Sequence, residues 1–259
     1  MSALAAFTLW RRELVRFFRQ PSRVVGAVAP PLLFWLLIGS GLSSSFRLPG
    51  GPAGLDYREY FFPGTLALIL LFAAIFSTIS VIEDRNQGFL QGVLTAPVSR
   101  ATIVAGKVLG GATLAWIQAA VFLAAAPLAG VPLTWGSALA AAGVLALLAL
   151  TLTAIGFAFA WRLDSVQGFH AVMNLVLMPM WLLSGAFFPV AGAPAWLEAL
   201  MRINPLTYGM AALRWALYGT SASLGEGIPG PATSIAATIL LGIAAFAADL
   251  LVTRGGRVE

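Results

Sequence analysis

Cysteine is absent from this chain, and histidine occurs once, as His170. Without cysteine there can be no disulfide and no thiolate metal site, and a single imidazole is too few for a histidine-based site. Charge is scarce as well, because charged residues are 10% of the 259 positions, whereas soluble domains carry about 25%. These absences favour a protein with no metal, no cofactor and no catalytic site of its own.

A complete phosphate-binding loop is also missing. The stretch Ala105–Val108 reads AGKV, which resembles the end of the loop that cradles nucleotide phosphates. That motif needs glycine where Ala101 stands and serine or threonine where Val108 stands. This chain is therefore not expected to hydrolyse nucleotide itself.

Apolar residues dominate what is present. Hydrophobic residues make up 59% of the chain, and its mean hydropathy is +0.90. Stretches of about 20 apolar residues can cross a bilayer as helices. Glycine and proline between residues 129 and 137 predict the turn that separates the third stretch from the fourth. We therefore predict an all-α integral membrane fold with six transmembrane helices. Their stretches are Val24–Leu42, Phe61–Ile82, Val108–Ala129, Ser137–Trp161, Gly168–Phe188 and Ala232–Val252.

Lysine and arginine are divided unequally between the two membrane faces that six spans define. The face with both termini carries eleven of them, and the other face carries four. Because basic residues accumulate on the cytoplasmic side, we expect both termini in the cytoplasm and a multi-pass protein of the plasma (inner) membrane. The net charge of +5 then reflects topology, and we expect no nucleic-acid partner. The four outer residues are Arg47, Arg58, Arg202 and Arg214.

Residues 1–23 form a separate element before the first span. Bulky apolar side chains recur at steps of three and four residues, and arginines do the same on another face. This pattern predicts an amphipathic helix that lies in the membrane interface. The helix is either an anchor that only fixes orientation or a lever beside a cytoplasmic partner. The apolar set is Phe7, Trp10, Leu14 and Phe17, and the basic set is Arg12, Arg16, Arg19 and Arg23.

A charged segment, Glu83–Lys107, interrupts the apolar sequence between the second and third spans. It cannot cross hydrocarbon, so we place it at one membrane face. Gly88 gives the backbone freedom, the following residues predict a short helix that ends near the next proline, and Ser99 is placed to cap the third span. Arg100 and Lys107 are expected near the headgroups. The segment is either a docking surface for a partner or an ordinary loop.

Two short helices are expected between the fifth and sixth spans, on the outer face. Pro194–Arg202 predicts the first, and Pro205–Tyr218 predicts the second, with Asn204 as its N-cap and Gly219 as its stop. The second segment is too short to span the membrane and too apolar for a free loop. The pair forms either a lid over a transport route or a surface feature without a gating role.

Asp249 is the only charged residue that we expect inside a span. It lies near the cytoplasmic end of the sixth span, where it is expected to pair with Arg254 or to reach the interface. The near absence of buried charge argues against a proton- or sodium-coupled carrier. It favours a route for an apolar or amphipathic solute. His170, at the start of the fifth span, is expected to be interfacial or helix-capping.

Four segments together carry a family resemblance. They are LWRRELVRFFRQPSRVV (Leu9–Val25), EDRNQGFLQGVLTAPVSR (Glu83–Arg100), MPMWLLSGAFFPV (Met178–Val190) and INPLTYGMAALR (Ile203–Arg214). In this order they resemble the connecting helix, the coupling segment, the fifth span with its outer exit, and the extracellular asparagine-proline signature of one family. That family is the membrane-spanning permease subunit of type-2 ABC exporters, the group of the daunorubicin-resistance and nodulation-factor export permeases. The coupling segment departs from the family, which carries more acid, at Asn86, Gln87 and Gln91.

The resemblance implies roles for three groups of residues. Those of the coupling segment would contact an ATPase: Glu83, Asp84, Arg85, Gly88, Leu90, Leu94, Pro97 and Arg100. Those of the connecting helix would act as its lever: Trp10, Arg12, Arg16 and Arg19. Those of the exit and lid are Phe187, Phe188, Asn204, Pro205, Tyr208 and Arg214.

The resemblance also implies a working complex. Two ABC ATPase subunits, which hold ATP and Mg, would drive this non-catalytic chain and a second copy or paralogue of it within membrane lipid. The solute would be a hydrophobic or amphipathic drug-like molecule or lipid, moved out of the cytoplasm or inner leaflet. The alternative in the same family is export of a lipid-linked saccharide or polysaccharide. A secondary carrier or channel would need buried coupling or filter groups, and a membrane-embedded enzyme would need a catalytic constellation at one depth.

We divide the single domain, residues 1–259, accordingly. Residues 1–23 are the connecting helix, 24–188 the first five spans, 189–231 the extracellular re-entrant helices, 232–252 the sixth span and 253–259 a cytoplasmic tail.

Overall fold

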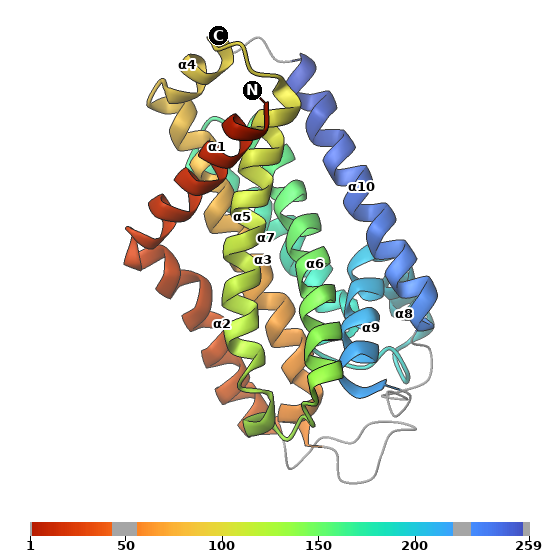
Figure 1. The fold of residues 1–259 in the computed structure, drawn as a ribbon. Helices are drawn as coiled ribbons and strands as arrows, with labels where there is room; N and C mark the ends of the chain where they lie inside the picture. The colour runs from red at the N-terminus through yellow and green to blue at the C-terminus, as the bar shows by residue number, and fades with distance from the viewer. Residues whose placement is uncertain (1, 43–55, 220–228, 256–259) are drawn as a thin grey trace.

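The computed structural model of the chain describes residues 2–42, 56–219 and 229–255. Within these ranges every regular element is a helix, so the expected all-α class is confirmed. Six helices are long and apolar enough to cross a membrane, as expected, and they stand alongside one another in Figure 1. The expected loop and tail positions Arg47 and Arg257 lie outside the described residues.

Each spanning helix begins before the apolar stretch that predicted it, because polar residues and caps prolong its first turns, but the third ends at Leu123, short of the expected Ala129. The spanning helices are α2 (Pro21–Leu42), α3 (Tyr57–Asn86), α5 (Arg100–Leu123), α6 (Trp135–Arg162), α7 (Val166–Trp181) with a π-helical turn at Leu182–Ala186, and α10 (Pro231–Gly255). The shorter helices are α1 (Ser2–Phe18), α4 (Phe89–Thr95), α8 (Ala195–Ile203), α9 (Pro205–Tyr218) and a 3-10 turn at Ala126–Ala129.

Local capping chemistry sets several of these ends. Ser99 Oγ accepts a hydrogen bond from Thr102 N at 3.2 Å, as its position predicted. Thr134 and Ser137 cap the start of α6 reciprocally, each side chain accepting from the other's backbone N–H. Gly130, with φ of 84°, ends the turn before α6. The expected break between the third and fourth spans is therefore confirmed.

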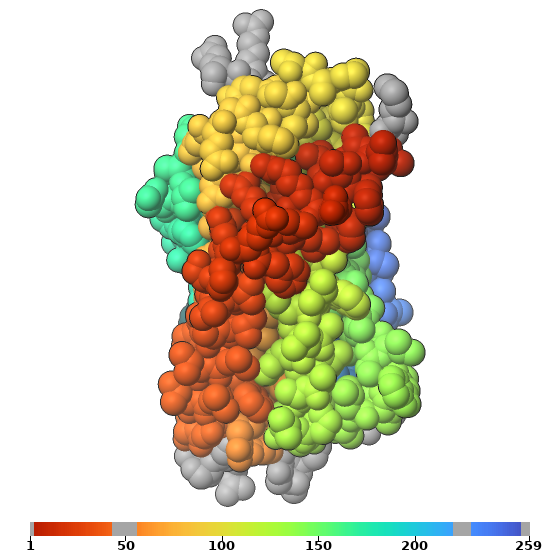
Figure 2. All heavy atoms as spheres, turned by 60° about the vertical axis from the view of Figure 1, so that its left-hand side comes forward, coloured from red at the N-terminus to blue at the C-terminus, as the bar shows by residue number. Residues whose placement is uncertain are grey.

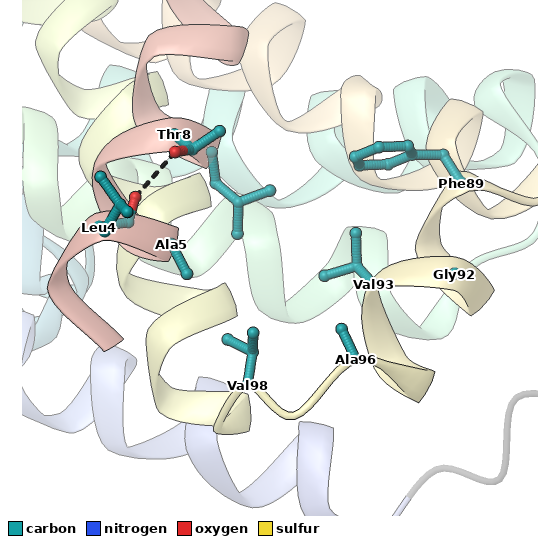
Figure 3. A pocket seen from close by; sticks show the side chains of 9 residues that line it. Leu4, Ala5, Thr8, Phe89, Gly92, Val93, Ala96 and Val98 are labelled. Carbon is teal, nitrogen blue, oxygen red and sulfur yellow. Dashed lines mark hydrogen bonds between the residues drawn. The ribbon is translucent and has the colours of Figure 1, made fainter. Parts of the chain in front are cut away.

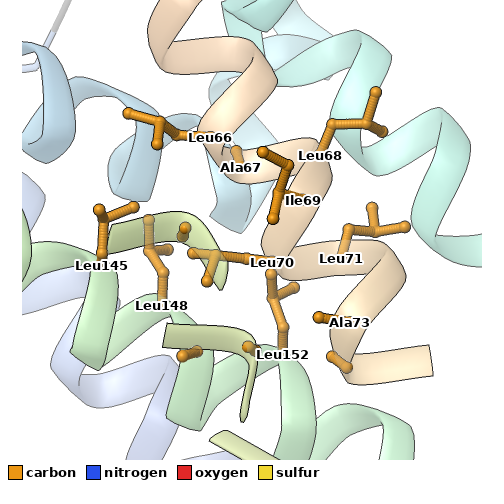
Figure 4. Packing of buried hydrophobic residues seen from close by; sticks show 14 of the residues in the cluster. Leu66, Ala67, Leu68, Ile69, Leu70, Leu71, Ala73, Leu145, Leu148 and Leu152 are labelled. Atoms are coloured by element: carbon orange, nitrogen blue, oxygen red, sulfur yellow. The ribbon is translucent and has the colours of Figure 1, made fainter. Parts of the chain in front are cut away.

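The core is organised around α3, which is buried along nearly its whole length. In Figure 4 the leucines of α3 meet Leu145, Leu148 and Leu152 of α6. Small residues allow the helices to approach closely. A Cβ on Gly111 of α5 would lie 2.6 Å from Ser77 Oγ, so only glycine fits where α3 and α5 cross.

The two ends of the bundle differ in what they carry. The helices α1 and α4, the start of α5 and the end of α10 gather at one end, at the top of Figure 1. In Figure 2 α1 runs obliquely across the molecule beneath α4. The helices α8 and α9 lie in the opposite half. Helices are thus present where the sequence predicted an interfacial helix and a coupling helix, and both roles remain predictions.

The fifth span is not one continuous helix. The regular helix stops at Trp181, and the π-helical turn after it contains Gly185 with φ of 80°. A left-handed residue cannot continue a right-handed helix. The expectation of a span that continues to Phe188 is therefore wrong in its last turn.

Candidate functional site

Asp84, in the last turn of α3, is the centre of a buried group of ion pairs. Its side chain is 0% exposed. Arg12 of α1 donates to both carboxylate oxygens at 2.7 Å, and Arg16 Nη1 lies 2.5 Å from Oδ1. Lys107 of α5 donates to the other oxygen. The hydrogen bond to Asp84 outweighs burial and raises the pKa of Arg12. The guanidinium therefore stays charged.

Glu13 and Glu83 complete the group. Glu13 is 5% exposed and accepts from Lys107 Nζ at 2.7 Å. Glu83 accepts from Arg16 Nη2 at 2.6 Å and also from Arg23 of α2. The helices α1, α2, α3 and α5 thus share one set of charges. We call it the Asp84 network, and its members are Arg12, Glu13, Arg16, Arg23, Glu83, Asp84 and Lys107.

Close packing holds α1 against α5 beside the network. A Cβ on Gly110 would lie 2.7 Å from Glu13 Cβ, so α1 and α5 touch almost backbone to backbone. Trp10 Nε1 donates to Thr113 Oγ1 at 3.1 Å. The helix α1 is therefore fixed by shape as well as by charge.

The network shows how three charged residues singled out in the sequence are packed within the described chain. Glu83 and Asp84, which were assigned to ATPase contact, face α1, and Asp84 has no exposed surface to offer a partner. Lys107, expected near the headgroups, is 3% exposed. Asp249 is consequently not the only charge buried in the spans. The reason is that the basic face of α1 covers the acidic end of α3, so these charges neutralise one another.

Arg85 and Arg100 connect the same end of the bundle to the remaining spans. Arg85 Nη1 donates to Leu163 O at 3.1 Å and to Asp164 Oδ1 at 3.0 Å, in the loop between α6 and α7. Arg100 donates to the carbonyl of Thr253 near the end of α10. At this face the ends of all six spans are thus joined by side-chain contacts. Each end is joined to the Asp84 network either directly or through one neighbouring helix.

An apolar groove separates α4 from α1 above the network. Gly88, with φ of 78°, turns the chain into α4, and Leu90 is buried beneath that helix. The groove has a volume of about 650 Å³. Figure 3 shows the side chains of both helices that line it. We call it the α1–α4 groove, and it is lined by Leu4, Ala5, Thr8, Leu9, Phe89, Gly92, Val93, Ala96 and Val98.

Arg12 joins this groove to the network. Its guanidinium carbon lies 3.7 Å from the centroid of the Phe89 ring, a cation–π contact. The same group binds Asp84. A displacement of α4 would therefore reach α3 through one side chain.

The remaining residues assigned to these two segments lie nearby without joining the network. Gly88, Pro97 and Arg19 are exposed, and Leu94 is half-buried.

A second candidate region is the break in the fifth span, in the half of the bundle away from α4. Where a helix stops inside a membrane, its free carbonyls need other donors. Tyr60 Oη and Arg214 Nη2 both donate to Gly185 O, at 2.9 and 2.6 Å. Tyr57 Oη donates to Phe187 O at 2.7 Å. Side chains of α3 and α9 thus replace the missing helical bonds.

Asn204 links the same break to the start of α9. Its Nδ2 donates to Met180 O at 2.6 Å. Its Oδ1 accepts from Leu206 N at 3.1 Å, so it caps α9 with Pro205 in the first turn, as the sequence predicted. Gly219 ends the helix, also as predicted.

The helix α9 is not a surface element, which corrects the place expected for Arg214. Arg214 is 3% exposed, and its guanidinium carbon lies 4.4 Å from the centroid of the Tyr60 ring. A ring and a carbonyl let this cation be buried far from solvent. Phe187 packs edge-on against Phe61. Tyr208 Oη donates to Arg202 O at 3.1 Å. Phe188 is half-buried.

Asp249 does not pair with Arg254. The Asp249 side chain is 0% exposed, and among the described residues its carboxylate oxygens have no hydrogen-bond partner. Five positions along a helix place two residues about 140° apart. Arg254 therefore faces outward while Asp249 faces the bundle.

One residue of the network, Glu13, was not predicted from the sequence, although the sequence contains a signal that could have found it. Glu13 is the only acidic residue among residues 1–23, and a lone carboxylate in an arginine-rich helix indicates a specific cation. Tyr57 and Tyr60 gave no such signal, because a tyrosine hydroxyl in an apolar stretch does not indicate which group it will bond to.

Six helices that are long and apolar enough to cross a membrane, with the Asp84 network and the short helix α4 at one end of the bundle, define a multi-pass membrane protein of the permease type. The chain belongs to the ABC-2 type transporter family, whose model matches residues 5–218. It is thus a transmembrane subunit of an ABC transporter, and membership of this family implies an ABC ATPase partner.

Individual relatives of the chain are consistent with this family membership. The chain is 28% identical over 221 residues to a protein named transport permease ycf38 of Cyanophora paradoxa, covering 84% of this chain and 75% of the other. It is 28% identical over 215 residues to nodulation protein J of Rhizobium meliloti (strain 1021), covering 82% and 80%. It is 31% identical over 163 residues to a protein of Escherichia coli (strain K12) named as the multidrug ABC transporter permease YbhR, covering 60% and 42%.

Proposed function

We propose that the chain is one permease half of an ATP-driven exporter, with both termini in the cytoplasm and the bundle in the plasma (inner) membrane. The observation that carries the proposal is the α1–α4 groove, which Arg12 joins to the Asp84 network through its contact with Phe89. An exposed apolar groove at a membrane protein's aqueous face is a docking surface when a partner of matching shape exists. The partner that family membership implies is an ABC ATPase.

The proposed mechanism is mechanical. ATP binding and hydrolysis, with Mg, take place in two ATPase subunits, which press on α4 and the groove. Arg12 passes the displacement from Phe89 to Asp84 and so to α3. Lys107 passes it to α5, while Arg85 and Arg100 reach the α6–α7 loop and α10. A packed, ion-paired contact of this kind moves as a unit, because separating its charges is costly.

A second permease, either another copy of this chain or a paralogue, completes the transport route in this proposal. The break at Gly185 is the element that would respond at the outer end. Its carbonyls are held by α3 and α9 side chains rather than by a regular helix. A shift of α3 would therefore be felt directly at the break, and α9 would act as an inserted gate.

The proposed solute is a hydrophobic or amphipathic molecule, such as a drug-like compound or a lipid, taken from the cytoplasm or inner leaflet. The charged side chains that are buried in the spans are held in ion pairs or bonded to carbonyls, with Asp249 as the exception. A lipid-linked saccharide stays as the second candidate, because nodulation protein J is among the relatives. The name of the Escherichia coli relative favours a drug-like solute.

Association of the permease with its ATPase tests the docking step. Val93→Glu places a carboxylate in the α1–α4 groove, and an unpaired charge buried at an interface costs several kcal/mol, so association should weaken by more than about tenfold. The measurement is the amount of ATPase that co-purifies when both chains are expressed together. Gln91→Glu adds the same charge to an exposed position of α4 that does not line the groove, and it should bind normally. Equal association of the two variants would overturn the docking site.

A further inference from the structure

A second apolar groove runs along the outside of the bundle between α5, α6 and α10. It has a volume of about 470 Å³. Its lining is almost wholly apolar, with Val108 and Leu109 on one wall, Leu150 on the second, and Phe246 and Leu250 on the third. Leu109 is 46% exposed, so the groove opens to the surroundings of the spans rather than into the core. We call it the α10 groove.

The length of the groove matches one leaflet of a bilayer. Along α10 it extends from Ile239 to Leu250, which is about 16 Å at about 1.5 Å per residue. The hydrocarbon core of a bilayer is about 30 Å thick, so half of it is about 15 Å. Thr151 is the one polar side chain among the lining residues, and its hydroxyl donates to Leu147 O at 2.9 Å, so the groove offers water few hydrogen-bond partners. The occupant that fits its depth and its chemistry is a single acyl chain.

Basic groups lie at one end of the groove. Arg254 follows Leu250 by four positions and so shares its face of α10. It is exposed, and within the parts of the chain that the structure describes no carboxylate forms an ion pair with it. Arg100 donates to the Thr253 carbonyl, which puts a second guanidinium at the same place. Asp249 is fully buried and does not line the groove.

We propose that the α10 groove binds an anionic phospholipid of the leaflet at this face, with one acyl chain in the groove and its phosphate at Arg254 and Arg100. Basic sites between spanning helices bind acidic headgroups, and each cation near the surface contributes measurably to that attraction. The lipid would fill the space between α5, α6 and α10 and hold the end of α10 to the start of α5. The proposal depends neither on the direction of transport nor on the ATPase.

Native mass spectrometry of the purified permease tests this site. The protein is delipidated in detergent and then exposed to phosphatidylglycerol or phosphatidylcholine of equal chain length. We expect one phosphatidylglycerol to be retained in preference to phosphatidylcholine. Arg254→Gln should weaken retention about fivefold, as loss of one cation predicts. Ala247→Phe should reduce it further, because Ala247 is an exposed residue that lines the groove.

Two matched variants separate a built site from general lipid adhesion. Ala244→Phe adds the same ring to an exposed position of α10 outside the groove, and Arg19→Gln removes an exposed arginine beside α1. Both should retain phosphatidylglycerol as the unmodified chain does. Equal retention of the two lipids, or equal loss in the groove variants and their controls, would overturn the proposal. Loss of a permease dimer in Ala247→Phe, with lipid unchanged, would assign the groove to a second copy of the chain and would equally overturn it.

Discussion

Arg12 and Asp84 lie 72 positions apart in the sequence and meet in a two-pronged ion pair, with both contacts at 2.7 Å. The geometry is that of a guanidinium fork on a carboxylate, which gives direction as well as strength. Asp84 is 0% exposed and Arg12 is 29% exposed. The pair therefore sits at the edge of the bundle, where a helix in the interface can be tied to a helix in the membrane.

Neutralising Asp84 should destabilise the protein strongly. In Asp84→Asn the cations of Arg12 and Lys107 lose their shared counter-charge, and removal of one partner from a buried pair costs about 3–5 kcal/mol. The measurement is thermal unfolding of the purified permease in detergent. Glu198→Gln is the matched control, because the Glu198–Arg202 pair is exposed and such pairs contribute about 0.2–1 kcal/mol. Similar shifts in the two variants would mean that the network is not a structural link.

Enlarging Gly110 should push α1 away from α5. A Cβ there would lie 2.7 Å from Glu13 Cβ, and overpacking of this kind costs about 1–3 kcal/mol. Gly110→Val should therefore lower thermal stability and ATPase association together. Gly143→Val is the control, since a Cβ on Gly143 meets nothing within 4 Å. If ATPase association survives in Gly110→Val, the position of α1 does not matter for docking.

Removing the guanidinium of Arg214 should loosen the break in the fifth span. Arg214→Ala deletes a charged donor to Gly185 O, and bonds of this type contribute about 1.5–3 kcal/mol. We expect lower thermal stability and altered transport, with ATPase association unchanged, because the site lies in the other half of the bundle. Arg202→Ala removes an exposed arginine and should leave both thermal stability and transport unchanged. Normal transport in Arg214→Ala would remove α9 and the break from the proposed mechanism.

Membrane orientation can be measured with little background, because the chain has no cysteine. Pro132→Cys and Gln91→Cys introduce single thiols at exposed positions, the first in the turn before α6 and the second in α4; Figure 1 shows α4 and the start of α6 at opposite ends of the bundle. With both termini in the cytoplasm, an impermeant maleimide should label the first in intact cells and the second only after permeabilisation. The opposite pattern would invert the topology.

The parts of the fold that the sequence predicted are those set by local rules. The six spans follow from the length of apolar stretches, and the caps at Ser99 and Asn204 follow from side chains that bond to backbone two or three residues away. The charge network could not be found in this way, because Arg12 and Asp84 are brought together only when α1 packs on the end of α3. The sequence therefore contains no sign that the Asp84 side chain is fully buried against α1, and the assignment of Glu83 and Asp84 to the ATPase contact stays a prediction.

The break at Gly185 and the burial of Arg214 had no local signature. Glycine is tolerated in spanning helices, so the presence of Gly185 does not by itself predict a residue in the left-handed conformation. Arg214 reads as an outer charge because the groups that make its burial affordable, the Tyr60 ring and the Gly185 carbonyl, come from two other elements. Asp249 was misjudged for a simpler reason, since its position around the helix turns it away from Arg254.

The account's central claim is that the ATPase docks in the α1–α4 groove, and site-specific photo-crosslinking tests it most directly. Val93 is replaced with benzoylphenylalanine in a cell that makes the permease and its ATPase, and the crosslinked chain is identified by peptide mass spectrometry. The same probe at Leu139, an exposed residue near the start of α6, is the control. The account predicts a crosslink from Val93, and none from Leu139, to a chain that carries a phosphate-binding loop. A Val93 probe that reacts only with lipid, while the complex is intact, would contradict it.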